Sequence, residues 1–573
     1  MDQFTEKHEY PFEKINHIYF FILIYIDIHL SLHKKPRKNY EIDKYISNMR
    51  FRYDIDTEEL VVSESTRTEY HQLNIWLTRH VKNYKYIPAF KMGVWNGKQT
   101  YFNNGRINLG LWKECLKGCQ EIGSPFIIDN KDDFPINRSI TLESVREFCR
   151  DFFKNHKIKD DQGKWVDFHP YDHQIETAFK ILKNRYCLAE VATSGGKTLI
   201  ISIVYFFTIR NIDPSAKILI IVPSITLVTQ FYDAIVDSNI GLNKDYDGGN
   251  SSPIDLKIEE IMSDRPRKHG SKEDPNIYIG TYQSLEKFPE EFFKKFHTIS
   301  VDESHGAKSK TLISILKKSF NSAYSRFGLS GTFPPDDSCE ILTIQSVIGP
   351  KITEVSANEL RKKGIITPMD IKVVIMNHND LDFSERVIQI RKGGYGKEAL
   401  EIEKDYIHQS TKRSNLIKKI VSKCDSNTLL LFHTIEYGQQ IFNLLSKEIT
   451  DKDFYYIDGG IPNKKREDIK KEMERTEGRT KVLIASYGTL STGVSINAIF
   501  NIVFVDSFKS EQIIIQSIGR ALRLHSDKSV ANIFDLVDVF SNDMSNILYK
   551  HFTEREKFYI KRQYPYKSIK INL

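Results

Sequence analysis

The chain of 573 residues lacks the cysteine patterns that mark disulfide frameworks and zinc sites. Its six cysteines are scattered, without a C-x-x-C pair or a Cys/His cluster at zinc spacing. Cys115 and Cys119 lie four residues apart on a predicted helix, where core packing and metal binding are the alternatives, and only two ligands are near for a metal. A reduced, cytoplasmic setting fits this cysteine usage.

The sequence also lacks an apolar run long enough to cross a bilayer. Residues 18–26 (IYFFILIYI) are strongly apolar, but Asp27 interrupts them before the ~20 residues that a helical span needs. Acidic residues precede this run where a secretory signal would be basic, so neither secretion nor stable membrane association is expected. Residues 1–48 are predicted to be an apolar extension of unknown role. The alternatives for it are a short anchor, a buried or interfacial helix or strand, and an upstream extension. Met49 could be a second translation start.

Internal repeats and low-complexity tracts are absent as well. The hydrophobic fraction of 40% and the charged fraction of 27% are ordinary for globular proteins, which excludes a largely fibrous or disordered chain. The length predicts two to four domains. A net charge of +7, from 82 basic and 75 acidic residues, is compatible with a polyanionic partner but does not require one.

The region 49–140 is predicted to be a small α+β domain. Asn-Gly pairs at 96–97 and 104–105 are strong turn signals between β-prone runs. Trp95, Lys98 and Arg106 bring aromatic and basic side chains to this region, a combination suited to binding a duplex or junction of nucleic acid. A core tryptophan in a hairpin is the alternative interpretation.

Two α/β lobes are predicted after this domain, each with a parallel sheet covered on both faces. Short apolar runs alternate with predicted helices, as such sheets require. The first lobe, 141–335, contains YCLAEVAT, KILIIVP, IYIGTY, TISVDES and RFGLSGT, and the second, 413–548, contains NTLLLFHT, DFYYIDG, TKVLIAS and NIVFVDS. The polar stretch 336–412 between them is predicted to be a linker region.

The last region, 549–573, is predicted to be a basic aromatic tail. From Lys550 onward it has seven Lys/Arg against two Glu. A solvated surface helix and a nucleic-acid contact through stacking aromatics are the two interpretations. The aromatic residues concerned are Phe552, Phe558, Tyr559, Tyr564 and Tyr566.

The string ATSGGKT, at 192–198, has the composition and context of a phosphate-binding loop. It follows a predicted strand and precedes a helical run, and its glycines allow backbone N–H groups to approach phosphates at a helix N-terminus. Lys197 would pair with the β- and γ-phosphates of ATP, and the Thr198 hydroxyl would bind Mg²⁺. The general pattern has a glycine at position 191, where this chain has Val191, so the strict pattern fails by one position.

DESH, at 302–305, follows the apolar run TISV about a hundred residues later. Carboxylates at the carboxyl end of such a strand lie at the edge of a parallel sheet, beside the phosphate loop. Asp302 is then placed to hold Mg²⁺ through water, and Glu303 to orient and deprotonate the attacking water. Either carboxylate alone would be an ordinary exposed acid, and the combination with the phosphate loop is what favours catalysis.

QSIGRALR, at 516–523, places Arg520 and Arg523 three residues apart on a predicted helix of the second lobe. Permanently charged guanidiniums there could reach the γ-phosphate and stabilise charge in the transition state. A solvated helix face is the alternative when the pair is considered alone.

In this order, the strings resemble the motif set of superfamily 2 helicases, whose two RecA-like lobes hydrolyse ATP and move along nucleic acid. Tyr171 and Gln174 resemble its adenine-reading motif, and the resemblance implies further nucleotide contacts at Thr193, Ser194, Gly195, Gly196 and Gly493. It implies nucleic-acid contacts at Pro223, Thr281, Gln283, Thr434 and Thr489. It implies coupling between the two sites through His305, Ser330, Thr332 and Gln516. Turns and helix caps are the alternative roles of the threonines.

Within the superfamily the chain resembles the UvsW family of bacteriophage recombination and repair helicases, with broader kinship to type III restriction motors and XPB-like helicases. The likeness starts near residue 50 and includes the W-N-G element at 95–97. Ser304 replaces a cysteine of the family pattern, at a position not expected to touch the reaction centre. The resemblance implies 3′-to-5′ movement on DNA and remodelling of D-loops, R-loops, forks and Holliday junctions, with a monomer favoured. An RNA or RNA–DNA hybrid helicase, and a duplex-binding scaffold with a decayed ATPase, are the alternatives.

Overall fold

The computed structural model describes residues 49–159, 164–240, 253–262, 274–491, 496–525, 527–542 and 544–573. From Met49 to Leu573 the chain forms one compact unit. The apolar run 18–26 and Gly493 lie outside the described residues. Within the part of the chain that is described, no helix has both the length and the apolarity needed to cross a membrane.

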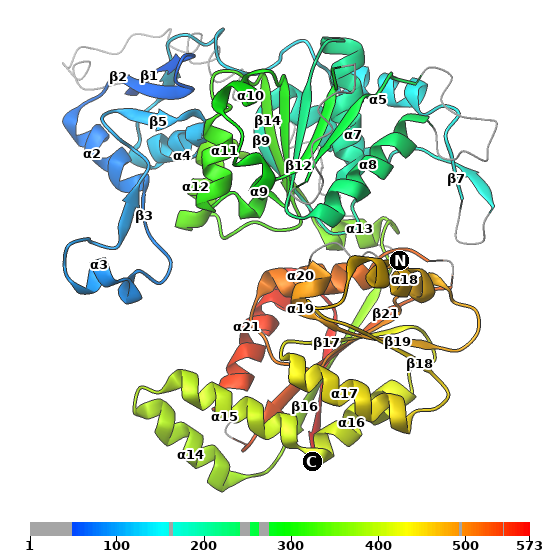
Figure 1. The fold of residues 1–573 in the computed structure, drawn as a ribbon. Helices are drawn as coiled ribbons and strands as arrows, with labels where there is room; N and C mark the ends of the chain where they lie inside the picture. The colour runs from blue at the N-terminus through cyan, green and yellow to red at the C-terminus, as the bar shows by residue number, and fades with distance from the viewer. Residues whose placement is uncertain are drawn as a thin grey trace, which may run out of the picture. The chain divides into compact units, whose positions relative to one another are not determined.

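The first domain has a mixed sheet in the order β5-β2-β1-β6, in which β1 pairs antiparallel with β2 and parallel with β6. A two-stranded ribbon, β3 and β4, projects from it and carries the short helix α3 at its far end (Figure 1). This confirms the predicted α+β class. The elements are β1 Met49–Asp54, β2 Glu59–Glu64, α2 Arg67–Trp76, β3 Thr78–His80, η1 Tyr84–Tyr86, α3 Pro88–Lys91, β4 Lys98–Thr100, β5 Arg106–Asn108, η2 Leu109–Leu111, α4 Trp112–Ile122 and β6 Phe126–Ile128.

The domain is bound to the first lobe through a buried ion pair and a shared core. Glu58 is 3% exposed and accepts hydrogen bonds from Arg326 at 2.6 Å and from the backbone N of Asn321 at 2.7 Å. Cys115 and Cys119 are fully buried in the core that this domain shares with the lobe, as the packing interpretation expects. A Cβ added at Gly110 would lie 1.9 Å from Gln345 O, which shows how closely the two backbones approach.

The first lobe is built on a parallel sheet in the order β11-β12-β10-β13-β14-β9-β15. Neighbouring residues of a strand point to opposite faces, so Ile218 and Ile220 join one apolar core while Leu219 and Ile221 join the other. Helices α7 and α8 cover one face and α9, α11 and α12 the other (Figure 1). The strands are β9 Tyr186–Val191, β10 Ile218–Val222, β11 Ile258–Ile261, β12 Ile277–Thr281, β13 Thr298–Asp302, β14 Ser325–Ser330 and β15 Lys351–Val355.

The remaining elements of this part of the chain flank the sheet or lead into it. They are α5 Leu142–Phe152, β7 Lys157–Lys159, β8 Trp165–Asp167, α6 Asp172–Asn184, α7 Lys197–Phe207, η3 Thr208–Ile212, α8 Ile225–Ile240, α9 Tyr282–Leu285, α10 Glu290–Lys294, η4 Ser304–Gly306, α11 Lys310–Lys317, α12 Cys339–Val347 and α13 Ala357–Lys362.

The second lobe has the same design, a parallel sheet in the order β18-β19-β17-β20-β21-β16-β22. Its strands are β16 Met369–Asn377, β17 Thr428–Phe432, β18 Asp453–Ile457, β19 Lys481–Ser486, β20 Asn501–Phe504, β21 Ala531–Val539 and β22 Tyr566–Asn572. Its helices are α14 Leu381–Lys392, α15 Gly396–Gln409, α16 Thr411–Ser422, α17 Ile435–Glu448, α18 Asn463–Glu474, α19 Tyr487–Ser491, α20 Glu511–Ala521 and α21 Ile547–Lys561. Two sheets of this kind confirm the predicted α/β class.

The sheet pairings differ from two of the predicted intervals. The stretch 336–412, expected to be a linker, contributes β15 to the first sheet and β16 to the second. The tail is also part of the second lobe, because β22 pairs with β16 and α21 is the helix that precedes it. Its aromatic side chains pack in the core instead of facing solvent or a ligand: Phe552, Phe558, Tyr559 and Tyr564 are all buried. The exact domain limits stay predictions.

Candidate nucleotide-binding cleft

The loop at 192–196 connects the buried strand β9 to helix α7 through two left-handed residues. Ser194 has φ 67° and Gly196, the N-cap of α7, has φ 79°. A Cβ at Gly196 would lie 2.1 Å from Gln174 Nε2, so glycine is needed there for space as well as for conformation. The loop therefore turns tightly and directs the N-terminus of α7, with its positive potential, toward the space above the sheet.

The predicted adenine-reading residues, Tyr171 and Gln174, lie at the start of α6, and Gln174 contacts this loop. The Gln174 side chain accepts a hydrogen bond from Tyr171 N at 2.8 Å and donates one to Gly195 O at 3.3 Å. His173 donates to the same carbonyl at 2.8 Å through Nε2, and burial lowers its pKa. Gln174 and His173 thus hold the phosphate loop in place, while Tyr171 remains 45% exposed.

The two acidic residues of DESH stand at the carboxyl end of β13, beside Lys197. Lys197 Nζ lies 3.6 Å from Glu303 Oε1. Burial and the neighbouring Glu303 raise the pKa of Asp302 to about 7. Burial also acts to raise the pKa of Glu303, but Lys197 and His305 outweigh it and lower that pKa to about 2. The pair therefore combines an ionised Glu303 with a crowded, partly desolvated Asp302.

A hydrogen-bonded chain leads from Glu303 to the end of β14. His305 Nδ1 lies 3.2 Å from Glu303 Oε2 and 2.9 Å from Ser330 Oγ. Ser330 lies 3.3 Å from Glu303 Oε2 and donates to Thr332 O at 2.8 Å. Three of the four predicted coupling residues are therefore in one network. The fourth, Gln516, lies one helical turn before Arg520 on α20.

Helix α20 of the second lobe packs directly against the phosphate loop. Ser194 Oγ donates to Gly519 O at 3.0 Å, and a Cβ at Gly519 would lie 2.3 Å from Thr193 Cβ. Burial and the neighbouring Arg523 lower the pKa of Arg520 to about 10, against the opposing effect of Glu303. Arg523 donates to Asn497 Oδ1 at 3.3 Å. The predicted arginines are thus cationic at neutral pH and lie on the helix that closes the cleft.

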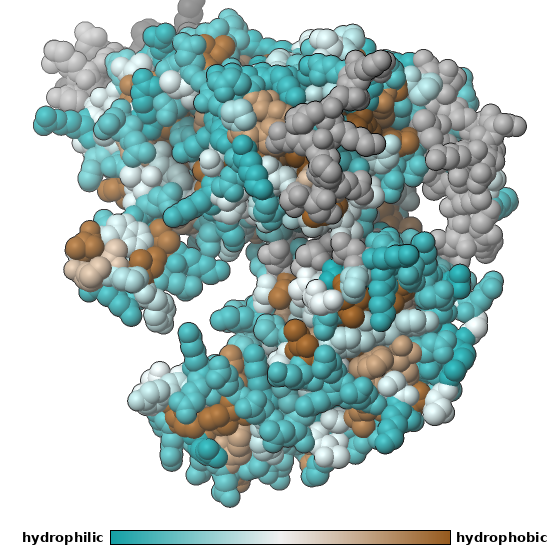
Figure 2. Space-filling view, viewed as in Figure 1, coloured by the Kyte–Doolittle hydropathy of each residue, from teal (hydrophilic) through white to brown (hydrophobic). Residues whose placement is uncertain are grey.

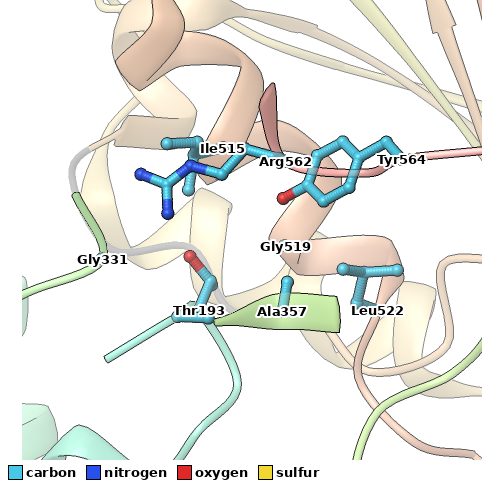
Figure 3. A pocket seen from close by; sticks show the side chains of 9 residues that line it. Thr193, Gly331, Ala357, Ile515, Gly519, Leu522, Arg562 and Tyr564 are labelled. Carbon is cyan, nitrogen blue, oxygen red and sulfur yellow. The ribbon is translucent and has the colours of Figure 1, made fainter. Parts of the chain in front are cut away.

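Figure 3 shows the small cavity enclosed between these parts. Thr193 and Gly331 of the first lobe face Ile515 and Gly519 of α20 across it, and Arg562 and Tyr564 complete its wall. Gly331 is a close neighbour of the reactive centre, because a Cβ there would lie 3.7 Å from Lys197 Nζ.

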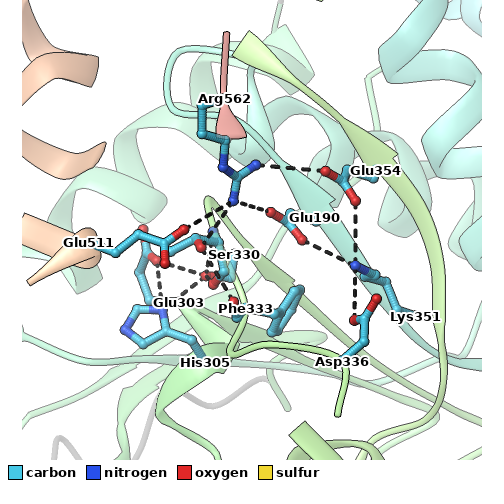
Figure 4. Close-up of polar contacts among 11 residues, drawn as sticks. Glu190, Glu303, His305, Ser330, Phe333, Asp336, Lys351, Glu354, Glu511 and Arg562 are labelled. Atoms are coloured by element: carbon cyan, nitrogen blue, oxygen red, sulfur yellow. Dashed lines mark hydrogen bonds and ion pairs between the residues drawn. The ribbon is translucent and has the colours of Figure 1, made fainter. Parts of the chain in front are cut away.

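Sequence reasoning missed a network of charged side chains around the buried Glu190, next to the loop (Figure 4). Arg562, which directly follows α21, donates to Glu190 Oε1 at 2.8 Å and to Thr332 Oγ1 at 3.2 Å. Lys351 Nζ lies 3.5 Å from the other oxygen of Glu190 and 3.3 Å from Asp336. Glu190 is the penultimate residue of β9, the strand that leads into the phosphate loop, so Arg562 joins the two lobes at the cleft. Neither Glu190 nor Arg562 belongs to a recognisable motif.

The predicted nucleic-acid contacts are more dispersed. Thr281 and Thr489 are buried, and Thr281 caps α9 by accepting from Ser284 N at 3.3 Å. Gln283 is exposed, and Pro223 and Thr434 are half-buried; each lies just after the carboxyl end of a strand. In the first domain Trp95 donates to Lys98 O at 2.9 Å, while Arg106 pairs with Asp54 at 3.3 Å and Glu59 at 3.0 Å. Their roles stay predictions.

A divalent cation fits the donors at this cleft. Asp302 supplies a buried carboxylate whose raised pKa reflects incomplete compensation of its charge, and Thr198 stands on the first turn of α7. Mg²⁺ prefers such oxygen donors and is usually held by one or two carboxylates together with substrate phosphates. Among the described residues there is no cluster of three or more His, Cys, Asp or Glu that would form a closed metal cage.

Two parallel sheets that meet at a phosphate loop, with an acidic pair on one side and arginines on the other, define a P-loop NTPase with two RecA-like lobes. Residues 167–335 match the family model "Type III restriction enzyme, res subunit", and residues 411–525 match "Helicase conserved C-terminal domain". The chain belongs to the superfamily 2 helicases, which are ATP-dependent enzymes.

Among known proteins, the chain is similar to the ATP-dependent DNA helicase uvsW of Enterobacteria phage T4. They are 28% identical over 536 residues, which cover 91% of this chain and 99% of that protein. The crystal structure of T4 UvsW matches with a TM-score of 0.45 and 24% identity over 92% of this chain and 99% of that one. The Type ISP restriction-modification enzyme LlaBIII bound to DNA matches with a TM-score of 0.52 and 13% identity, over 72% of this chain and 32% of that chain.

Proposed function

We propose that this protein is an ATP-dependent DNA helicase or translocase that remodels branched DNA such as D-loops, R-loops, forks and Holliday junctions. The observation that carries the proposal is the pair of the buried Asp302 and the half-buried Glu303, which lies beside Lys197 and faces the arginine helix α20 of the other lobe. DNA as the substrate is supported by the likeness to a phage helicase named for its action on DNA.

ATP is the substrate, with Mg²⁺ on its phosphates, and its phosphoanhydride bond is cleaved. Residues of the first lobe hold the nucleotide. Lys197 and the backbone N–H groups of the loop bind phosphate oxygens, while Asp302 and Thr198 hold the cation. Glu303 orients the attacking water and accepts its proton. Its low pKa keeps it ionised, and the contacts with His305 and Ser330 fix where its oxygens point.

The second lobe completes the site. Arg520 and Arg523 neutralise the charge that spreads over the transferred phosphoryl group. Because Gly519 lies against Thr193, and Arg562 against Glu190 and Thr332, the arginines reach the phosphates only when the lobes are closed. Closure with ATP and opening after hydrolysis then provide the mechanical step.

Movement along DNA follows from this cycle if each lobe holds the strand in turn. Gln283 on one lobe and Thr434 on the other are accessible and suited to contacts with the DNA backbone, which set register without reading sequence. Thr281 and Thr489 are buried, so their part in binding would be to position the loops that carry these contacts. The 3′-to-5′ direction and a monomeric motor are part of the proposal. Support for the chain Glu303–His305–Ser330–Thr332 as the link between nucleotide and DNA is its continuity within the first lobe.

The test is ATP hydrolysis by the wild type and by Glu303→Gln, without nucleic acid and then with single-stranded DNA, a forked duplex, a Holliday junction and RNA. Strong stimulation by branched DNA that the substitution abolishes is the expected result. Equal or greater stimulation by RNA would favour an RNA or hybrid helicase instead. No hydrolysis with any polymer would favour a binding scaffold and contradict the proposal. Duplexes with only a 3′ or a 5′ tail then give the direction.

A further inference from the structure

The ribbon formed by residues 78–100 is a segment of the first domain whose acidic and basic side chains are all of one sign. It contains five basic residues and no Asp or Glu. All of it is described, and only Gly97 is buried. A segment of this composition attracts a polyanion over its whole length. The basic residues are Arg79, Lys82, Lys85, Lys91 and Lys98.

The far end of the ribbon is apolar. Tyr86 is 76% exposed, Met92 70% and Val94 75%, which are among the most exposed large apolar residues described for this chain. Figure 2 shows the corresponding apolar surface at the end of the ribbon, around α3, bordered by hydrophilic surface. Exposed apolar side chains gathered at one protruding point indicate a contact site, because a monomeric surface rarely gathers them.

Aromatic packing inside the ribbon holds these apolar residues outward. Tyr84 stacks on His80 at 4.4 Å between ring centroids and meets Phe90 edge-on at 4.8 Å. Gly97 has φ 77°, and a Cβ there would lie 2.2 Å from the Tyr84 ring. The ribbon thus has its own cluster of packed aromatic rings, and Tyr86, Met92 and Val94 lie outside that cluster.

The base of the ribbon is mounted on helix α12 of the first lobe. The Tyr101 hydroxyl donates to Cys339 O at 2.8 Å, and Lys82 lies 3.9 Å from Glu340. The same helix follows Thr332 in the chain and packs against η4, which contains His305. The ribbon is therefore connected through α12 to the network that surrounds Glu303.

The geometry points to the ribbon as a wedge that enters a DNA junction: Tyr86, Met92 and Val94 pack against the bases where the duplex ends, and the lysines hold the flanking phosphates. This inference rests on the proposed function for its choice of DNA. Apolar side chains that unstack base steps, with cations on the adjacent phosphates, are an established way for proteins to open or bend a duplex. An apolar protein groove would offer these cations no counter-charge, which disfavours a protein partner.

The test compares two variants of the full chain on a fork that carries 2-aminopurine at the junction, whose fluorescence rises when the base unstacks. In one variant, Tyr86→Ser, Met92→Ser and Val94→Ser remove the apolar end and keep every charge. In the other, Lys85→Gln and Lys91→Gln remove charge and keep the apolar end. A matched control, Leu381→Ser, removes an apolar side chain of similar exposure (61%) on α14 of the second lobe.

We expect the apolar variant to lose the fluorescence rise and to unwind the fork about tenfold more slowly, because the contacts between its side chains and the bases at the junction are lost. ATP hydrolysis stimulated by single-stranded DNA should stay at the wild-type level. The lysine variant should bind the fork more weakly. The slope of its log binding constant against log salt concentration should fall by the amount expected for about two lost phosphate contacts, and the fluorescence rise should still appear at saturation. The control should match the wild type.

An apolar variant that unstacks and unwinds like the wild type would overturn the inference, and so would a control that is equally impaired. The fluorescence measurement needs no ATP. A wild type that unstacks the junction but never hydrolyses ATP would therefore contradict the proposed function and leave the wedge supported. A wild type that hydrolyses ATP on DNA without unstacking the junction would contradict the wedge and leave the proposed function supported.

Discussion

The cleft between the lobes and the ribbon of the first domain use opposite physical designs. In the cleft, charged groups are largely shielded from solvent and paired at short distances, as Glu303 is with Lys197 and His305. On the ribbon, cations and apolar side chains are largely exposed, and the acids that approach its base, Glu114 and Glu340, lie on other elements. A buried polar site depends on every partner, whereas an exposed surface depends on the sum of its contacts. Substitutions should therefore act steeply in the cleft and gradually on the ribbon.

The steepest effect is expected at Glu303. Glu303→Gln keeps the size of the side chain and removes the base that accepts the proton of the attacking water. The rate of ATP hydrolysis should fall about 10⁴-fold, at the upper end for general-base catalysis. Steady-state phosphate release measures this, together with binding of a fluorescent ATP analogue, which should persist. Glu290→Gln on α10, an exposed acid, is the control, and a comparable loss there would contradict the steep design.

Arg520 should come next. Arg520→Gln removes a half-buried cation that the second lobe brings toward Glu303, and catalysis should fall about 10³-fold, as when an arginine finger is lost. The measurement is kcat for ATP on saturating single-stranded DNA. Arg138→Gln, at an exposed arginine of the first domain, serves as the control. A variant of Arg520 that loses ATP affinity but keeps kcat would show that the residue binds the ground state only.

How much of the cleft the sequence predicts depends on whether its residues are adjacent in the chain. Phosphate binding and water activation require particular residue types at short spacing, so Lys197, Thr198, Asp302 and Glu303 could be found from ATSGGKT and DESH alone. Strands β9, β10, β13 and β17 could be found because they are continuous apolar runs. Glu190 and Arg562 could not, because they are 372 residues apart in the chain and neither has a local pattern around it.

The errors have the same origin. Interleaved lysines and aromatics predict a basic tail at 549–573, but a helix and an edge strand share this composition when only one face is buried. The stretch 336–412 has weak periodicity because β15 and β16 are interrupted by polar residues. The Tyr86–Met92–Val94 surface has no periodic signal at all, since exposure at a turn is decided by the fold of the ribbon.

Contact between the lobes gives the third prediction. A Cβ at Gly519 would lie 2.3 Å from Thr193 Cβ, so Gly519→Ala should hold α20 away from the phosphate loop. Misplacement of reacting groups by about 1 Å can cost about 100-fold, and kcat should fall by that order with little change in thermal stability. Gly396→Ala on α15 is the control, because nothing lies within 4 Å of its added Cβ. Wild-type kcat in Gly519→Ala would mean that the lobes meet differently during catalysis.

Arg562 gives a smaller effect. Arg562→Gln removes the cation that joins Glu190 and Thr332 to the second lobe, but Lys351 continues to neutralise Glu190. We expect kcat on DNA to fall about tenfold, in the range of a coupling energy between contacting residues, with KM for ATP nearly unchanged. The double variant Glu190→Gln/Arg562→Gln should recover part of that loss if the pair acts as a unit. Lys561→Gln, the exposed neighbour, is the control.

The smallest expected effect is the change in stability of the ribbon variant, which tests whether its side chains serve folding or direct contact with DNA. The ribbon variant Tyr86→Ser, Met92→Ser and Val94→Ser changes exposed side chains and should alter stability by no more than about 0.5 kcal/mol per site. Glu58→Gln, in contrast, leaves the buried Arg326 without its ion pair and should destabilise by about 3–5 kcal/mol. Hydrogen exchange of the β1 and β2 amides measures both. Faster exchange in the ribbon variant would mean that the apolar end stabilises the domain. The loss of junction unstacking in that variant would then no longer be evidence that these side chains contact DNA directly.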